Sequence, residues 1–198
     1  MIKKIIVCFM LSFISSVGLS QIEKNERGST KNLKDIAQYN IVFDYSEVII
    51  PNYDSEEDFL ATTMSRFEEK ELGKGDQFKK LWFDSRKDQF EPRFMVSFNK
   101  RFRKGKVKVA KNVPGAFYTM KIHTFLISAG YNVGIARKRA EIGAEVSVFE
   151  TANPSNILWA IDFLEVPGSG TLGIDFEMGY RISEAYAKLA KLVVKKIK

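Results

Sequence analysis

The sequence predicts an α+β fold, in which an antiparallel-rich sheet of about five strands carries helices packed on one face. Three long segments, 116–127, 139–151 and 157–166, have β-branched and aromatic residues at every second position, the period of a strand. The last segment, 176–198, has apolar residues at helical spacing and is predicted to be a C-terminal amphipathic helix. A sheet with one apolar face must be covered, and this helix is the natural cover.

The second long strand separates an apolar face from a polar one. Ile142, Ala144, Val146 and Val148 alternate with Glu141, Glu145 and Ser147. The turn residues 153–156 (Asn-Pro-Ser-Asn) predict that the second and third strands form an antiparallel hairpin. We also expect a cross-strand ion pair between Lys121 and Glu145.

Two shorter strands precede this sheet. Residues 40–45 alternate as a strand, continue loosely through 48–50 and stop at Pro51. Residues 106–110 alternate lysine and valine, which is typical of a short edge strand protected by its lysines.

The helices lie between these two strands. Residues 55–72 carry an apolar stripe at helical spacing, and a second helix starts at Asp76 and is interrupted or restarted at Pro92. For the first helix, two pairs have N-cap spacing: Asp54 with Glu57, and Ser55 with Asp58.

Residues 1–20 have the three regions of a cleavable secretory signal peptide. The start is basic, residues 5–17 form an apolar run too short to span a bilayer comfortably, and 18–20 (Gly-Leu-Ser) is a small-residue cleavage pattern. We expect cleavage after Ser20, and the alternative is an uncleaved anchor. Cys8 lies within the apolar run rather than directly after a cleavage pattern, so the chain is not predicted to be a lipoprotein.

The signal peptide predicts a periplasmic or secreted protein. Cys8 is the one cysteine and leaves with the signal peptide, so the mature chain has no disulfide. Residues 21–38 are polar and lack an apolar period, and we predict a flexible leader there. Residues 39–198 suit a single α+β domain. No second apolar stretch is long enough to span a membrane.

Residues 168–173 spell G-x-G-x-x-G, the form of a dinucleotide-binding loop. The setting is not that of a nucleotide site, because Pro167 precedes the motif and no strand follows it to complete a βαβ unit. We interpret the segment as a flexible connection, and we predict no cofactor.

The residues of a catalytic or metal site lack their partners. His123 is the only histidine and the mature chain has no cysteine, which leaves a hydrolytic triad or a histidine metal site incomplete. We interpret His123 as a cross-strand pairing residue. The acidic clusters at 54–58 and 68–71 are typical of solvated helix starts and faces. We predict no catalytic, cofactor-binding or metal-binding residue.

Two basic clusters form a candidate anion-binding surface on a chain of net charge +7. Their residues are Lys100, Arg101, Arg103, Lys104, Lys106, Lys108, Arg137, Lys138 and Arg139. Anionic lipid headgroups or envelope polymers would bind such a surface, and nucleic acid fits a secreted protein least. The alternative is a solvated face that protects a sheet edge, which is what charge runs usually are.

The second face of the sheet is a candidate partner face. It is more apolar than exposure to solvent requires, through Phe117, Phe125, Phe149 and Leu164. Either another helix layer covers this face, or a partner does, which would be an envelope protein or a second copy of the chain.

The order of elements is a strand, helices, a short strand, three long strands, a glycine-rich loop and a helix. With the hairpin 146–161 (VSVFETANPSNILWAI) and the ending 179–191 (GYRISEAYAKLAK), it resembles small secreted or lipid-anchored envelope proteins of Gram-negative bacteria. In architecture it is similar to the amino-terminal domain of the Tol-Pal translocation protein and to the periplasmic domain of the curli secretion channel. The resemblance implies binding or scaffolding and brings no catalytic residues.

We therefore expect a non-enzymatic periplasmic or secreted protein with a binding or scaffolding role at the cell envelope. The alternative is a soluble module that binds an anionic envelope ligand through its basic surface. An enzyme of unknown type is third, because no group of residues indicates a reaction.

Overall fold

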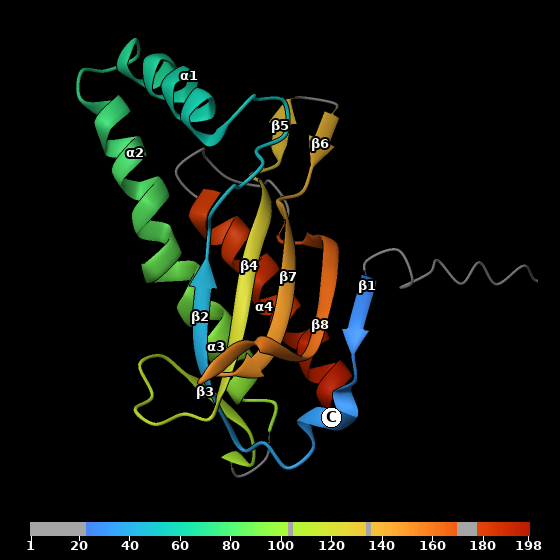
Figure 1. Cartoon of the computed structure of the whole chain (residues 1–198). Helices are drawn as coiled ribbons and strands as arrows, with labels where there is room; N and C mark the ends of the chain where they lie inside the picture. Colours follow the sequence, from blue (N-terminus) through green and yellow to red (C-terminus); the bar gives the residue numbers. More distant parts are fainter. Residues whose placement is uncertain (1–22, 103–104, 134–135, 170–177) are drawn as a thin grey trace, which may run out of the picture.

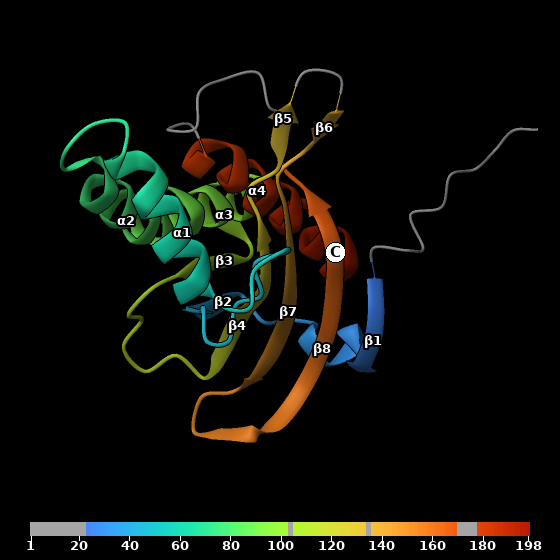
Figure 2. The same ribbon diagram turned by 90° about the horizontal axis from the view of Figure 1, so that it is seen from above.

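A computed structural model of the chain describes residues 23–102, 105–133, 136–169 and 178–198. The predicted signal peptide lies outside these residues, as does the glycine-rich motif beyond Ser169. The described residues combine one large sheet with helices that lie on one of its faces (Figure 1, Figure 2). The α+β class and the C-terminal helix are confirmed, whereas the helix predicted at 55–72 does not pack on the sheet.

The large sheet has six strands in the order β1-β8-β7-β4-β2-β3. The strands are β1 (Glu23–Gly28), β2 (Gln38–Asp44), β3 (Lys108–Ala110), β4 (Tyr118–Ser128), β7 (Glu141–Glu150) and β8 (Asn153–Pro167). A separate two-stranded sheet pairs β5 (Tyr131–Val133) with β6 (Ala136–Lys138).

The sheet is mixed and has six strands, so the prediction of an antiparallel-rich sheet of about five strands is confirmed only in part. The pairs β1–β8, β8–β7 and β7–β4 are antiparallel, whereas β2 runs parallel to both β3 and β4. After β2 the chain passes through the helices before it returns to the sheet. A long crossover of this kind, unlike a tight turn, can bring the next strand back in the same direction.

The edge strand β1 lies where the polar sequence predicts a flexible leader. Its residues are exposed on both faces apart from Glu23, so they show no apolar period. Long-range contacts hold the strand, among them two from aromatic and basic side chains: Trp159 Nε1 donates to Glu26 Oε1 (2.8 Å), and Lys196 Nζ lies 2.9 Å from Glu23 Oε2. The strand is therefore stabilised by distant residues rather than by its own sequence.

The hairpin between β7 and β8 is confirmed, but its turn is not at residues 153–156. Glu150 pairs with Asn153, so Thr151 and Ala152 form the turn. The next pair is Phe149 with Ile157, which leaves 154–156 as extra residues on β8. Proline has no N–H for a sheet ladder, so Pro154 fits this irregularity.

The helices are α1 (Glu56–Glu68), α2 (Lys74–Ser85), α3 (Glu91–Asn99) and α4 (Met178–Ile197), with a 3-10 turn η2 (Thr30–Leu33) and a π-helical turn η3 (Arg86–Phe90). Ser55 is the N-cap of α1, and its Oγ accepts from the Asp58 N–H at 3.1 Å. Of the two predicted caps, the pair Ser55 with Asp58 is the one that forms.

Pro92 does not end the helical segment, because α2, η3 and α3 follow one another without a break. A proline ring crowds the carbonyl four residues earlier, here that of Asp88, and supplies no N–H. The turn widens at this point, and the Glu91 N–H donates to Arg86 O, five residues back.

The core lies between the sheet and the helices α3 and α4. The predicted inward stripe of β7 is buried, and so is the apolar stripe of α4, with Ile182, Ala185, Tyr186, Leu189 and Val193. α1 packs against α2 instead of the sheet, through the aromatic contacts of Phe59 with Trp82 and of Phe67 with Phe78. Within the described residues, no helix is long and apolar enough to cross a membrane.

Candidate anion-binding cleft

An open cleft of about 410 Å³ lies where α3, α4 and the end of β8 meet. Most of the charged side chains that line it are cations: Arg93, Lys100, Arg101, Arg139, Lys188 and Lys191. Glu184 is the one acidic residue among the described residues that line the cleft. We call this feature the basic cleft.

The basic cleft joins parts of the two predicted basic clusters. Lys100 and Arg101 come from the first cluster and Arg139 from the second. Two residues of the first, Lys106 and Lys108, are exposed near or on β3 and do not line the cleft. Arg103, Lys104 and the side chain of Arg137 lie outside the described residues, and Lys138 pairs with Glu141 at 2.6 Å.

Two contacts set the register of α3 and α4. Arg93 Nη2 pairs with Glu184 Oε1, and Ser97 Oγ donates to Ala187 O at 2.8 Å. The partners advance together along both helices, so α3 and α4 run side by side in the same direction (Figure 1). The same register brings Lys100 level with Lys191.

Arg101 is held in place at the end of α3. Its Nη1 donates to the Ser97 carbonyl and to Ser97 Oγ (2.7 Å), so the guanidinium also satisfies a free carbonyl at the helix end. The side chain is therefore partly preorganised. Because Ser97 also bonds to α4, one buried serine links the two walls of the cleft.

The end of β8 fixes the remaining wall. The Gly168 N–H donates to Ala140 O (2.7 Å) and the Ser169 N–H to Arg181 O (3.3 Å), which ties the sheet to the first turns of α4 and positions Arg139. A Cβ at Gly168 would lie 2.2 Å from Arg181 O, a distance that requires something to shift. A glycine is needed here for close approach of two backbones.

The charge of the cleft is poorly compensated. Among the described residues, Lys100, Arg139, Lys188 and Lys191 form no ion pair, and only Arg93 pairs with an acid. Like charges gathered in a concave site raise the local potential and favour an incoming anion. The arrangement is suited to binding an anion.

Sequence reasoning missed Arg93, Lys188 and Lys191. The lysines lie opposite the apolar stripe of α4, so they fit a solvated face as well as they fit a site. A usable signal exists in the spacing of Glu184, Lys188 and Lys191, which lie on one face of α4 at intervals of four and three residues. The sequence does not show which helix packs beside these residues, because that depends on the tertiary structure.

The open face of the sheet, away from the helices, carries the predicted partner residues in two groups. Phe117 is 83% exposed and near Phe149, since the Thr151 N–H donates to Phe117 O (2.9 Å) and Phe149 is opposite Thr119. Phe125 is half-buried at the other end, with its ring against Gly143. Leu164 is also half-buried, near Gly143 by register.

Charged pairs separate these two apolar groups. Lys121 Nζ lies 2.7 Å from Asp44 Oδ2, whereas Glu145 pairs with Arg27. The predicted ion pair of Lys121 with Glu145 is therefore wrong, because Lys121 is opposite Ser147. His123 lies on β4 opposite Glu145, and its Nε2 lies 3.1 Å from Ser46 O, just after the end of β2.

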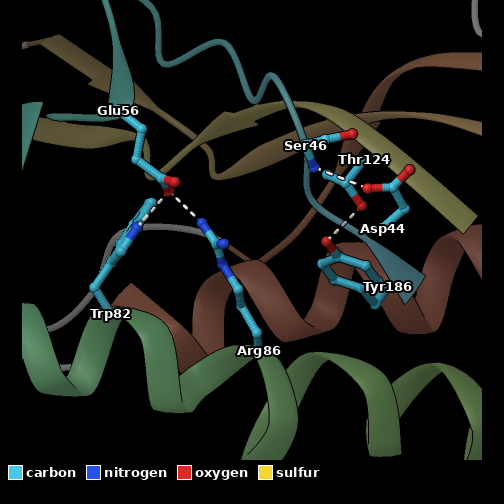
Figure 3. A network of polar contacts seen from close by, with 7 residues as sticks. All are labelled: Asp44, Ser46, Glu56, Trp82, Arg86, Thr124 and Tyr186. Carbon is cyan, nitrogen blue, oxygen red and sulfur yellow. Dashed lines mark hydrogen bonds and ion pairs between the residues drawn. The ribbon is translucent and has the colours of Figure 1, made fainter. Parts of the chain in front are cut away.

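Polar side chains from the helices and from β4 form a second group of contacts (Figure 3). Glu56 Oε1 accepts from Trp82 Nε1 (2.7 Å) and from Arg86 Nη2, which joins α1 to α2 and η3. Nearby, Thr124 Oγ1 and Tyr186 Oη lie 2.8 Å apart in the core. Burial raises the pKa of Tyr186 above its usual range, so its hydroxyl stays protonated. These contacts connect elements of the fold.

Comparison of the chain with protein-family models, curated proteins and solved structures finds no match. The resemblance to Gram-negative envelope proteins stays a prediction.

Proposed function

We propose that the protein is a periplasmic or secreted binding protein of the cell envelope that holds an anionic ligand in the basic cleft. The observation that carries this proposal is the convergence on one cleft of six cations from α3 and the residues after it, from α4, and from the segment before β7. Their sequence positions are far apart, so a chance run of charge along one segment does not account for the cluster.

The chemistry of the side chains supports the same conclusion. A guanidinium offers a planar fork of donors that matches a phosphate or carboxylate, and an ammonium offers a compact point charge. Both kinds line the cleft, and Arg101 is held by Ser97 before any ligand arrives. Preorganised donors lose less side-chain entropy when an anion binds.

The test is a calorimetric titration of the purified protein with inorganic pyrophosphate, which measures the binding affinity. Affinity should fall steeply between about 0.05 M and about 0.3 M salt, because the Debye length shortens over that range. The double substitution Lys188→Glu with Lys191→Glu should weaken binding more than about a hundredfold, since two charge-assisted contacts are replaced by repulsion.

A matched control separates the cleft from overall charge. Lys106→Glu with Lys108→Glu changes the net charge by the same amount on a surface outside the cleft. This control should retain most of the affinity. Equal losses in the two double variants would mean that general charge attracts the probe, and the proposal would fail.

The open sheet face supports a second candidate function, docking of an envelope protein or of a second copy of the chain. The supporting observation is the large ring of Phe117, which is 83% exposed. Light scattering and crosslinking of Phe117→Asp against the unaltered protein test this function. Loss of a crosslinked complex would support it, and an unchanged monomer in both would exclude it.

A further inference from the structure

The two ends of the basic cleft differ in chemistry. One end holds Lys100, Arg101, Lys188 and Lys191, and none of the described acidic residues that line the cleft is there. The other end holds the ion pair of Arg93 with Glu184, and Arg139 lies beside the first turns of α4 at this end. On α4, Lys188 and Lys191 follow Glu184 by four and seven residues, which places them about 6 Å and about 10 Å along the helix axis.

Glu184 is an acceptor placed within a site for anions. Its side chain is 26% exposed, and Arg93 contacts only Oε1. Among the described residues, the other oxygen of the carboxylate accepts no hydrogen bond. A carboxylate repels a second anion but accepts well from a hydroxyl group. The second oxygen of Glu184 therefore suits a neutral hydroxyl donor better than a second phosphate.

The other lining residues narrow the class of ligand further. No aromatic side chain is among the described residues that line the cleft, and the apolar contacts are limited to Val96, Ala187 and Pro167. Nucleobases in protein sites usually stack on aromatic rings, which are lacking among these residues. The lining thus favours a ligand that is polar along its whole length.

We infer that the basic cleft binds a polyol phosphate, such as a phosphorylated sugar, with its phosphate among Lys100, Lys188 and Lys191 and its hydroxyl groups donating to Glu184. This inference rests on the proposed function and specifies its ligand class. Glu184 is then the residue that distinguishes a phosphate carrying hydroxyl groups from phosphate alone.

The test compares two soluble probes of similar charge, glucose 6-phosphate and inorganic phosphate. The unaltered protein should bind glucose 6-phosphate about tenfold more tightly, the value of one hydrogen bond to a charged group. Glu184→Ala should tighten the binding of inorganic phosphate, because repulsion is removed, and should abolish the preference for the sugar. Glu69→Ala removes the same charge outside the cleft and should leave the preference intact.

The outcomes separate this inference from the proposal on which it rests. Equal affinity for both probes, or a preference that survives Glu184→Ala, would overturn the polyol assignment and leave an anion site. If neither probe binds, nor pyrophosphate, the anion site itself is refuted. Vesicles containing phosphatidylglycerol, whose headgroup is a polyol phosphate, show whether the ligand is a lipid or a free molecule. Vesicle binding that glucose 6-phosphate displaces indicates a lipid headgroup. Binding of glucose 6-phosphate without vesicle binding indicates a free ligand.

Discussion

Arg93 on α3 pairs with Glu184 on α4, and this ion pair forms one end of the basic cleft. The pair does two things at once. It helps to set the register of two parallel helices, and it leaves a carboxylate beside a group of cations that form no ion pair among the described residues. The geometry of the cleft and its charge therefore depend on the same contact.

Replacement of Arg93 should weaken anion binding without unfolding the protein. Arg93→Ala removes one cation and leaves Glu184 uncompensated, so affinity for pyrophosphate should fall about tenfold. The free energy of unfolding should change by less than about 1 kcal/mol, because the pair is partly exposed. Arg27→Ala breaks the pair with Glu145 on the open sheet face and is the matched control, with binding unchanged.

Gly168 should tolerate no larger residue. Gly168→Ala places a Cβ 2.2 Å from Arg181 O, so the end of β8 must move away from α4. We expect a loss of about 1–3 kcal/mol in the free energy of unfolding and weaker anion binding, since Arg139 moves too. In Gly105→Ala a Cβ meets nothing within 4 Å, and only its positive φ of 64° costs stability. Unchanged affinity for pyrophosphate in Gly168→Ala would show that this glycine does not shape the cleft.

The hydroxyl of Tyr186 should matter for stability alone. Tyr186→Phe leaves the buried Thr124 hydroxyl without its partner, at a cost of about 1–3 kcal/mol in urea unfolding. Tyr180→Phe, on the same helix at a side chain 57% exposed, should change stability by less than about 0.5 kcal/mol. Equal effects of the two substitutions would show that the contact with Thr124 contributes nothing.

Asp44 should make the stability depend on acid pH. Burial opposes its ionisation, but hydrogen bonds from Lys121 and Ser46 outweigh burial and hold the pKa of Asp44 well below its usual range. Because the folded pKa is lowered, the stabilisation is complete above the unfolded pKa of about 3.9 and is lost as the pH falls from there towards the folded pKa.

Urea unfolding across this pH range measures the effect. Compared with Asp44→Asn, the unaltered protein should be more stable at about pH 6, and the difference should shrink below about pH 4. Asp35→Asn removes the same charge at an exposed carboxylate and is the control for the loss of one negative charge. If the stability difference between the unaltered protein and Asp44→Asn stays constant with pH, ionisation of Asp44 does not cause the acid dependence.

Local patterns in the sequence predicted the elements whose stability is local. Alternation located β4, β7 and β8, helical spacing located α4, and cap spacing identified Ser55. The edge strand β1 was not predicted, because its polar residues are held by Trp159 and Lys196, which are far away in the chain. The parallel pairing of β2 was not predicted either, because it depends on the path of the helical crossover.

The site followed the same division. The sequence identified Lys100, Arg101 and Arg139 as cations with no acid beside them, but it also included Lys106 and Lys108, which lie outside the cleft. A run of charge does not reveal which of its members face a concavity. The pairing of α3 with α4 makes that selection, and it adds Lys188 and Lys191 from a face that looks solvated in the sequence.

Binding of anions in the basic cleft is tested most directly by amide chemical shifts of the isotope-labelled protein during titration with inorganic pyrophosphate. The shifts should change together, with one saturation curve, in residues 97–101, 168–169 and 187–191, and should stay constant at Lys106 and Lys108. Changes centred on β3, or small changes spread over all exposed lysines without saturation, would contradict a defined anion site between α3 and α4.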